Sequence, residues 1–257
     1  MAKKKSQQEN IIKQKLTLLS NNTLEYNTFL QEFNFLKNTY GIELNLELLK
    51  FLGLNYHLNS KNQITLKSRF TPIKEETFCI VDIETNGSSF KNGGCIIEIG
   101  AIKYKNGNII DKFSSFVKTQ CIPEHITELT GININMVQNA PNIKNVLMNF
   151  KMFLQDSIFV AHNANFDFNF ISSWCEKIGY GPLLNSSLCT LELSRKCIDA
   201  PKHGLESLKQ LLNIEYAHHR ALNDALSATK VLEHCINYLP IFVGTTEELI
   251  SFSKGKK

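Results

Sequence analysis

The chain has 257 residues, of which 43% are hydrophobic, and a formal net charge of +4. This composition predicts a globular protein with a sizeable core, long enough for one domain with an extension or for two small domains. No segment approaches the roughly 18 consecutive apolar residues of a membrane helix, and the Lys-rich start lacks the apolar stretch of a signal peptide, so we expect a cytoplasmic protein without a membrane partner.

Charge and cysteine content exclude some classes of site but indicate no function. Residues 1–76 hold 11 Lys or Arg against 7 Asp or Glu, whereas residues 77–257 hold 17 of each. An acidic metal site can offset a basic groove, so this balance neither supports nor excludes nucleic-acid binding. The seven cysteines are scattered and never spaced as Cys-x-x-Cys, which predicts neither a disulfide framework nor a structural zinc site.

Residues 1–73 predict a small unit of their own. The first ten residues are polar, with the composition of a frayed terminus. Apolar residues spaced by three and four then predict helices at 12–19, 26–36 and 44–52. Two short apolar runs flank a polar turn and predict a hairpin over 54–66. Three helices followed by a hairpin favour a winged-helix-like extension, with a helical docking segment that makes no DNA contact as the alternative. Residues 69–77 are expected to be a linker.

From Phe78 the pattern changes to strands, and then to strands alternating with helices. Strands are predicted at 78–85, 95–104, 109–117 and 157–161, with the hairpin signal Asn106-Gly107 between the second and third. Helices are predicted at 143–154, 166–178, 190–197, 204–212 and 220–238. This order implies an α/β fold in which a mixed sheet carries helices on its faces. We expect a main domain over 77–237 and a C-terminal tail over 238–257.

Two acids stand in the apolar strand that opens the main domain. Side chains alternate across a strand, so Asp82 and Glu84 point to the same face. Burying two like charges together costs several kcal/mol unless a positive charge compensates them, and this strand contains no Lys or Arg. A bound divalent metal is the natural compensation, and a solvated edge strand is the alternative.

Further acids and a histidine follow at the boundaries of later elements. Asp167 lies near the start of a predicted helix, where an Asp also serves as an ordinary first-turn acid. His219 and Asp224 are five residues apart and cannot face one site from within a single helix. We therefore expect His219 in the loop before the helix and Asp224 in its second turn.

The set is more specific than its members. Four carboxylates and a histidine, in the order Asp-x-Glu, Asp, His-x4-Asp, suit phosphoryl transfer with two metals, which needs hard oxygen ligands and a base. With its flanking residues the set resembles the DEDDh 3′-to-5′ exonucleases, most closely the proofreading epsilon subunit of bacterial DNA polymerase III. The resemblance rests on five ordered blocks: Asp82-Ile-Glu-Thr-Asn-Gly87, Ile97-Glu-Ile-Gly-Ala101, Leu129-Thr-Gly-Ile132, His162-Asn-Ala-Asn-Phe-Asp167 and His219-Arg-Ala-Leu-Asn-Asp224. It covers residues 77–237 and implies a ribonuclease H-like fold with a mixed five-stranded sheet.

The resemblance also implies a role for each of these residues. Asp82 would bridge two divalent cations, and Glu84 and Asp224 would complete the site of the cation that activates water. Asp167 would help to hold the second cation, and His219 would be the general base. Mg²⁺ is the expected cation, and Mn²⁺ is compatible with the same ligands.

The expected pocket for the terminal nucleotide is also implied by the resemblance. Its lining would be Thr85, Leu129, Asn163 and Phe166. Phe166 could stack on a base and Leu129 could pack on the sugar, but both also suit a hydrophobic core. Three other histidines are given no catalytic role: His162, His203 and His218.

The implied function is metal-dependent release of 5′-mononucleotides from a single-stranded or frayed 3′ end of DNA, as the proofreading epsilon subunit. The implied partners are the catalytic alpha subunit of polymerase III and the sliding clamp, although we recognise no clamp-binding motif in residues 239–257. One departure from the family is Asn86, where many members have a second Thr, and another is the segment of 76 residues before the first catalytic strand. Two alternatives stay open: the same chemistry on RNA or in repair, since metal ligands do not read the 2′-hydroxyl, and a non-catalytic nucleic-acid-binding or scaffold protein.

Overall fold

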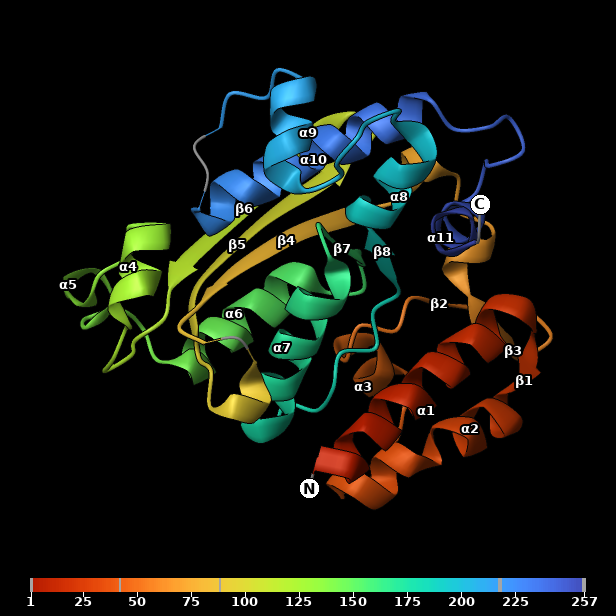
Figure 1. Ribbon diagram of the computed structural model, residues 1–257. Helices are drawn as coiled ribbons and strands as arrows, with labels where there is room; N and C mark the ends of the chain where they lie inside the picture. The colour runs from red at the N-terminus through yellow and green to blue at the C-terminus, as the bar shows by residue number, and fades with distance from the viewer. Residues whose placement is uncertain (1, 42, 88, 217–218, 256–257) are drawn as a thin grey trace.

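A five-stranded mixed sheet forms the centre of the protein, for which a computed structural model describes residues 2–41, 43–87, 89–216 and 219–255. The strand order is β6-β5-β4-β7-β8 (Figure 1). The strands are β4 (Phe78–Thr85), β5 (Ile96–Lys105), β6 (Asn108–Phe116), β7 (Ile158–Ala161) and β8 (Ser187–Cys189). The strands β4, β5 and β6 form an antiparallel meander, and β7 and β8 run parallel to β4. The predicted α/β fold class is confirmed.

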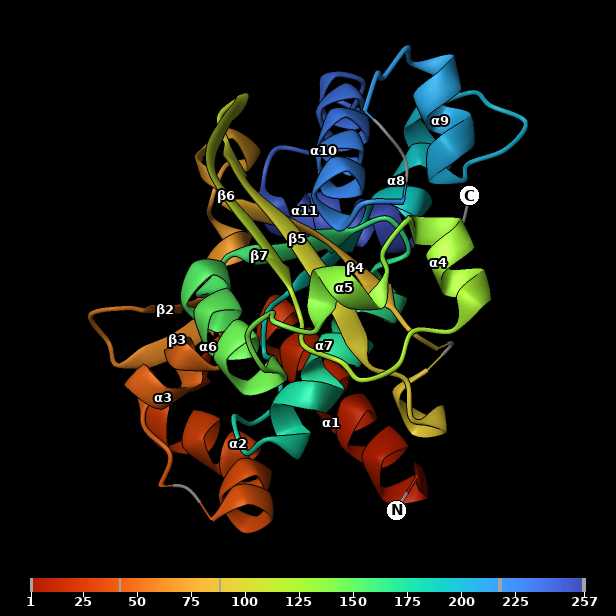
Figure 2. The same cartoon turned by 90° about the vertical axis from the view of Figure 1, so that its left-hand side faces the viewer.

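Helices cover both faces of this sheet (Figures 1 and 2). On one face lie α6 (Ile143–Leu154) and α7 (Ala164–Lys177). On the other face lie α8 (Thr190–Cys197), α9 (Leu205–Leu211) and α10 (Ala221–Asn237). Three short helices lie in the loops after β4 and β6: η3 (Phe90–Asn92), α4 (Glu124–Thr130) and α5 (Ile134–Val137). The sequence patterns predicted the helices on both faces of the sheet, but neither α4 nor α5, which are too short to show a period.

The alternation of β4 decides where its acids point. Cys79, Val81 and Ile83 are buried in a cluster with residues of α6 and α7, whereas Phe78 and Ile80 are buried with residues of α10. Residues of the same parity share a face, so Asp82 and Glu84 face α10. Because β4 lies between β5 and β7, the alternative of a solvated edge strand is wrong.

The N-terminal unit contains three helices and a small antiparallel sheet of order β1-β3-β2. Its elements are α1 (Ala2–Asn21), β1 (Leu24–Glu25), α2 (Tyr26–Tyr40), α3 (Leu46–Phe51), β2 (Tyr56–Leu58) and β3 (Gln63–Leu66). The expected frayed terminus over residues 1–10 is wrong, since α1 begins at Ala2. Lys, Gln and Glu are good helix formers although they are polar, so the helix continues beyond its apolar face.

The N-terminal unit is packed on the main unit. Leu184, from the loop before β8, is buried in the hydrophobic cluster of the N-terminal helices. Its backbone N–H donates to the carbonyl of Leu52 at 2.7 Å, directly after α3. The end of α3 therefore faces the main unit rather than solvent.

The expected linker and tail are also packed. The segment after β3 forms η1 (Lys67–Arg69) and η2 (Ile73–Glu75), and the tail forms α11 (Thr246–Lys254). Pro72 forms a β-bridge with Thr245, and Ile73 shares the buried cluster under α10 with Leu249. Among the described helices, none is long and apolar enough to cross a membrane.

Candidate active site

The end of one strand and the starts of two helices meet at one edge of the sheet. The carboxyl end of β4 carries Asp82 and Glu84, the start of α7 carries Asp167, and the start of α10 carries Asp224. Asp82 and Glu84 are half-buried, and Asp167 and Asp224 are buried. The structure thus brings the sequence-predicted acids together from positions 142 residues apart in the chain.

Asp167 is held against β4 by the backbone. The pairing of β4 with β7 ends at Ile80, so the N–H of Ile83 lies beyond the neighbouring strand. Asp167 Oδ1 accepts a hydrogen bond from this N–H at 3.1 Å. The helix begins at Ala164, two residues earlier than predicted, because Asn163 takes a left-handed conformation with φ of 78° and turns the chain out of β7. This places a 3% exposed carboxylate beside the two acids of β4.

His219 and Asp224 lie on either side of the start of α10. His219 is in the loop, as predicted, but Asp224 is in the first turn rather than the second, because α10 begins only at Ala221. The backbone N–H of His219 donates to Asp224 Oδ2 at 3.1 Å. Ligand atoms of Glu84, His219 and Asp224 all lie within 4.8 Å of one another. The structure therefore unites the histidine with two of the acids.

The clustered acids have raised pKa values, which a bound cation would offset. Burial, followed by the charges of Asp167, Asp224 and Glu84, raises the pKa of Asp82 well above its usual range. Burial and the charge of Asp224 raise the pKa of Glu84 to about 7, and burial raises that of Asp167 to about 8. Carboxylate groups that resist ionisation this strongly fit a divalent cation, which restores their charged form. The donor set of hard oxygens and one imidazole suits such an ion.

Two charged residues of the site were not predicted. Glu98 on β5 is 1% exposed and lies directly across from Glu84 in the sheet. Arg220, next to His219, donates to Glu98 Oε1 through Nη2 at 2.9 Å. Asp82 was predicted as a site residue because it is a charged residue inside an apolar strand. The same pattern in the run Ile97–Ala101 could have identified Glu98.

The four residues expected to line the nucleotide pocket are half-buried or exposed. Thr85 ends β4, and its hydroxyl donates to the carbonyl of Gly87 at 2.9 Å. Asn163 is exposed at the start of α7, and Phe166 is 37% exposed and packs beside Phe170. Leu129 is 52% exposed on α4. Because Leu129 and Phe166 are both exposed, the core alternative for these two residues is wrong.

His162 and His203 form hydrogen-bonding contacts outside the acid cluster. His162 Nε2 is 2.9 Å from the carbonyl of His203, and its Nδ1 is 3.0 Å from Thr190 Oγ1. Burial lowers the pKa of His162 to about 4, so the ring stays neutral. His203 is in turn 3.1 Å from Ser194 Oγ. His218, which was given no role, lies outside the described residues.

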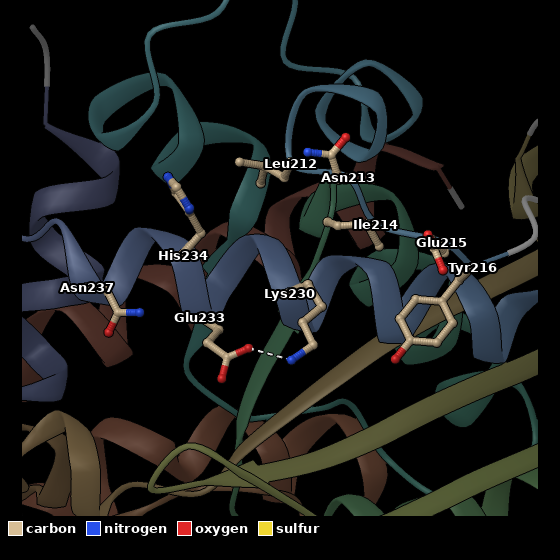
Figure 3. Close-up of a pocket in the computed structure, with 9 residues that line it drawn as sticks. All are labelled: Leu212, Asn213, Ile214, Glu215, Tyr216, Lys230, Glu233, His234 and Asn237. Carbon is tan, nitrogen blue, oxygen red and sulfur yellow. Dashed lines mark hydrogen bonds and ion pairs between the residues drawn. The ribbon is translucent and has the colours of Figure 1, made fainter.

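A large surface hollow lies away from the acids, on the outer side of α10. It has a volume of about 610 Å³ and is lined by residues 212–216 and by Lys230, Glu233, His234 and Asn237 (Figure 3). Lys230 and Glu233 form an ion pair within it. The hollow holds none of the predicted site residues.

Comparison with known proteins agrees with this geometry. A family model described as "Exonuclease" (RNase_T) matches residues 79–232. The DNA polymerase III PolC-type of Staphylococcus haemolyticus (strain JCSC1435) is 42% identical over 171 residues, which are 65% of this chain and 12% of that protein. The chain therefore matches only about an eighth of the length of this relative.

Two solved structures show the same fold. One is exonuclease X in complex with 5′ overhanging duplex DNA, with a TM-score of 0.56 and 23% identity over 68% of this chain and 99% of that chain. The other is the zinc-bound complex of E. coli exonuclease I with single-stranded DNA, with a TM-score of 0.59 and 18% identity over 65% of this chain and 42% of that chain. The expected ribonuclease H-like exonuclease fold is confirmed.

Proposed function

Because this chain belongs to the RNase_T exonuclease family, of the DEDDh type, we propose that it removes 5′-mononucleotides from the 3′ end of DNA. The observation that carries the proposal is the convergence of Asp82, Glu84, Asp167 and Asp224 with His219 at one edge of the sheet. A retired site has no physical need for four clustered acids whose ionisation opposes one another, which disfavours a non-catalytic scaffold.

The acids are proposed to hold two divalent cations, with Mg²⁺ as the default. The charges of the other acids of the cluster all act on Asp82. Asp82 is therefore the residue that would contact both cations. Glu84 and Asp224 would complete one site, and Asp167 would contribute to the other. When bound, the cations supply positive charge to the phosphate and lower the pKa of the attacking water.

The protein's own residues carry the remaining steps. His219 accepts the proton of the water that attacks the terminal phosphorus, because a neutral imidazole can take a proton at neutral pH. The bond from phosphorus to the 3′ oxygen of the preceding nucleotide breaks, which leaves a 5′-mononucleotide and a new 3′-hydroxyl. Thr85, Leu129, Asn163 and Phe166 are proposed to hold the terminal nucleotide, with the exposed ring of Phe166 available for stacking.

The proposed setting is proofreading for a bacterial DNA polymerase III, the task of an epsilon subunit, in the cytoplasm where the chromosome is copied. The support is the match to a protein named DNA polymerase III PolC-type. The catalytic alpha subunit and the sliding clamp are the proposed partners, and pull-down with the polymerase would test the first of them.

The purified full chain with Mg²⁺ should shorten a 5′-labelled single-stranded DNA stepwise and release 5′-mononucleotides. Asp82→Ala should abolish this activity, and Asp111→Ala, which changes an exposed acid on β6, should not. Immediate release of the labelled 5′ nucleotide without a ladder would contradict the polarity, and retained activity in Asp82→Ala would contradict the site.

The same residues could act on RNA or in repair, because metal ligands do not read the 2′-hydroxyl. Turnover on DNA and RNA oligomers of matched sequence distinguishes these substrates. We expect the DNA oligomer to be cut faster.

A further inference from the structure

An ion pair with one buried member, Glu98, joins the sheet to the loop that carries His219. Glu98 is 1% exposed on β5, and Arg220 precedes α10. Arg220 Nη2 donates to Glu98 Oε1 at 2.9 Å, and Arg220 Nε lies 3.3 Å from both carboxylate oxygens. We infer that Glu98 and Arg220 are positioning residues that hold His219 and Asp224 over the acids of β4, an inference that rests on the proposed function of this site.

The sheet register explains why this pair is needed. Glu84 and Glu98 are directly opposite on β4 and β5, and like charges in this position repel each other. Arg220 compensates the charge of Glu98 through their ion pair. Glu98 thus binds Arg220 within the protein, and Glu84 remains suited to a cation.

Arg220 is fixed by two adjacent strands. Its guanidinium lies 5.2 Å from the ring centroid of Phe116, which is opposite Glu98 on β6. A cation over an aromatic face is attracted by the ring, in addition to its bond with the carboxylate. The side chain therefore has a carboxylate and a ring as partners, although it remains 41% exposed.

The backbone of the loop is anchored to the same carboxylate. The N–H of Ala221, the first residue of α10, donates to Glu98 Oε2 at 3.1 Å. The strand is close enough that a Cβ added to Gly100 would lie 2.2 Å from the carbonyl carbon of Ala221. Glu98 therefore binds both the side chain before the helix and the first N–H of the helix.

His219 needs this support because its backbone is strained. Its φ is 60°, in the left-handed region that residues with a Cβ rarely adopt. Strained residues persist only where the surrounding structure determines their conformation. Asp224 holds the N–H of His219 on one side, and the Glu98–Arg220 pair holds the next residue on the other.

A double-mutant cycle on the full chain separates positioning from DNA binding. Glu98→Gln, Arg220→Gln and the double variant are compared for kcat and KM on a short single-stranded DNA with saturating Mg²⁺. Each single variant should lower kcat by about 100-fold, because small displacements of catalytic groups have effects of this size. The double variant should be no worse than either single one, KM should stay within about twofold, and Arg220→Lys should recover part of kcat.

Arg220 would instead be a phosphate contact if its variants raised KM with a strong salt dependence while Glu98→Gln remained fully active, which would overturn the inference. Arg195→Gln, which breaks the exposed pair with Glu192 on α8, is the matched control and should change neither constant. Thermal melting of each variant establishes that it folds.

Hydrogen exchange of residues 219–224 provides a readout that does not depend on activity. Glu98→Gln should remove protection of the Ala221 amide, because that amide loses its charged acceptor. A wild type without nuclease activity, together with this loss of protection, would refute the proposed function but support positioning. An active wild type, with unchanged kcat and unchanged exchange in Glu98→Gln, would refute positioning.

Discussion

At the scale of single residues, the buried acids of this protein are stabilised in two different ways. Glu98 has a partner in Arg220, whose guanidinium donates several hydrogen bonds to the Glu98 carboxylate. Burial raises the pKa of Asp82, and the charged neighbours that add to this shift, among the residues that the structure describes, are all acids. This difference in partners separates a positioning carboxylate from one suited to a cation.

Replacing Asp82 with Asn should exchange activity for stability. The amide keeps the shape of the side chain but removes a carboxyl group whose ionisation is opposed by burial and by neighbouring acids. The metal-free protein should therefore melt about 2 °C higher, which corresponds to roughly 0.5–1 kcal/mol in a chain of this length. Nuclease activity with Mg²⁺ should fall by at least about 100-fold, since the central carboxylate is lost. Melting in EDTA and turnover assays measure both effects, and Asp111→Asn, at an exposed position, should change neither. A lower melting temperature for Asp82→Asn would contradict the repulsion described here.

At the scale of elements, helix starts set the geometry of the site. Both α7 and α10 begin beside the end of β4, and each carries an acid in its first turn. The positive end of a helix dipole favours a negative charge there, which partly offsets the crowding of carboxylates. The same principle explains why the sequence alone allowed Asp167 to be read as an ordinary first-turn acid.

The end of α3 is a second place where one element determines the position of another. Gly53 has a φ of 103°, and a Cβ placed on it would lie 1.9 Å from Asn185 Oδ1. Asn185 in turn donates from Nδ2 to the carbonyls of Gln155 and Ser157. The N-terminal unit is therefore fitted against the main unit through a contact that permits no side chain.

Gly53→Ala should destabilise the protein by at least about 2 kcal/mol, because it combines a steric clash with an unfavourable φ. Gly131→Ala is the matched control: its φ is 69°, but no atom lies within 4 Å of an added Cβ, so it should cost only about 1 kcal/mol. Urea unfolding of both variants gives the comparison. Equal losses would show that the contact between the two units adjusts without cost.

At the scale of the whole molecule, the three segments of the chain form one packed body. Leu184 joins the main unit to the N-terminal core, and Ile73 and Leu249 join the expected linker and tail to the core under α10. The acids of the site at the sheet edge repel one another in the folded protein. The stability of the protein should therefore depend both on pH and on divalent cations.

The stability of the metal-free protein should fall as the pH rises from about 5 to 8. The folded-state pKa is raised to about 7 for Glu84 and about 8 for Asp167, from ordinary values of 4.5 and 3.8. Between the ordinary and raised values the folded chain binds more protons than the unfolded chain, so a rise in pH favours unfolding. Thermal or urea unfolding in EDTA across this range measures the slope, and a stability that increases towards pH 8 would contradict it.

Mg²⁺ should reverse this loss, because it binds the ionised carboxylates of the folded chain. At pH 8 a concentration 100 times the dissociation constant should add about 2.7 kcal/mol, whereas at pH 5 protons compete for the same oxygens and the gain should be smaller. Unfolding curves at both pH values with and without Mg²⁺ give the two gains. An equal gain at pH 5 would place the cation outside these acids.

Local patterns in the sequence determined much of the fold. The period of β4 assigned Asp82 and Glu84 to one face, the apolar spacing predicted α6, α8 and α10, and the ordered acid blocks identified the family. The capping box of α11, in which the side chains of Thr245 and Glu248 bond each other's backbone, is a local sequence signal of the same kind. Such features depend on residues within about one helical turn of each other, so a single chain segment contains all the information.

Only the tertiary structure decided how the site is held. Glu98 and Arg220 are 122 positions apart, and the local sequence around either residue does not indicate that they form an ion pair. The three-residue β8 and the close approach of α10 to Gly100 likewise follow from neighbours that are distant in the chain. The sequence by itself determined which residues could carry the chemistry, because residue type and local spacing are encoded where they occur. The position of His219 and the compensation of Glu98 required the fold, because both result from strand register and helix packing across the whole domain.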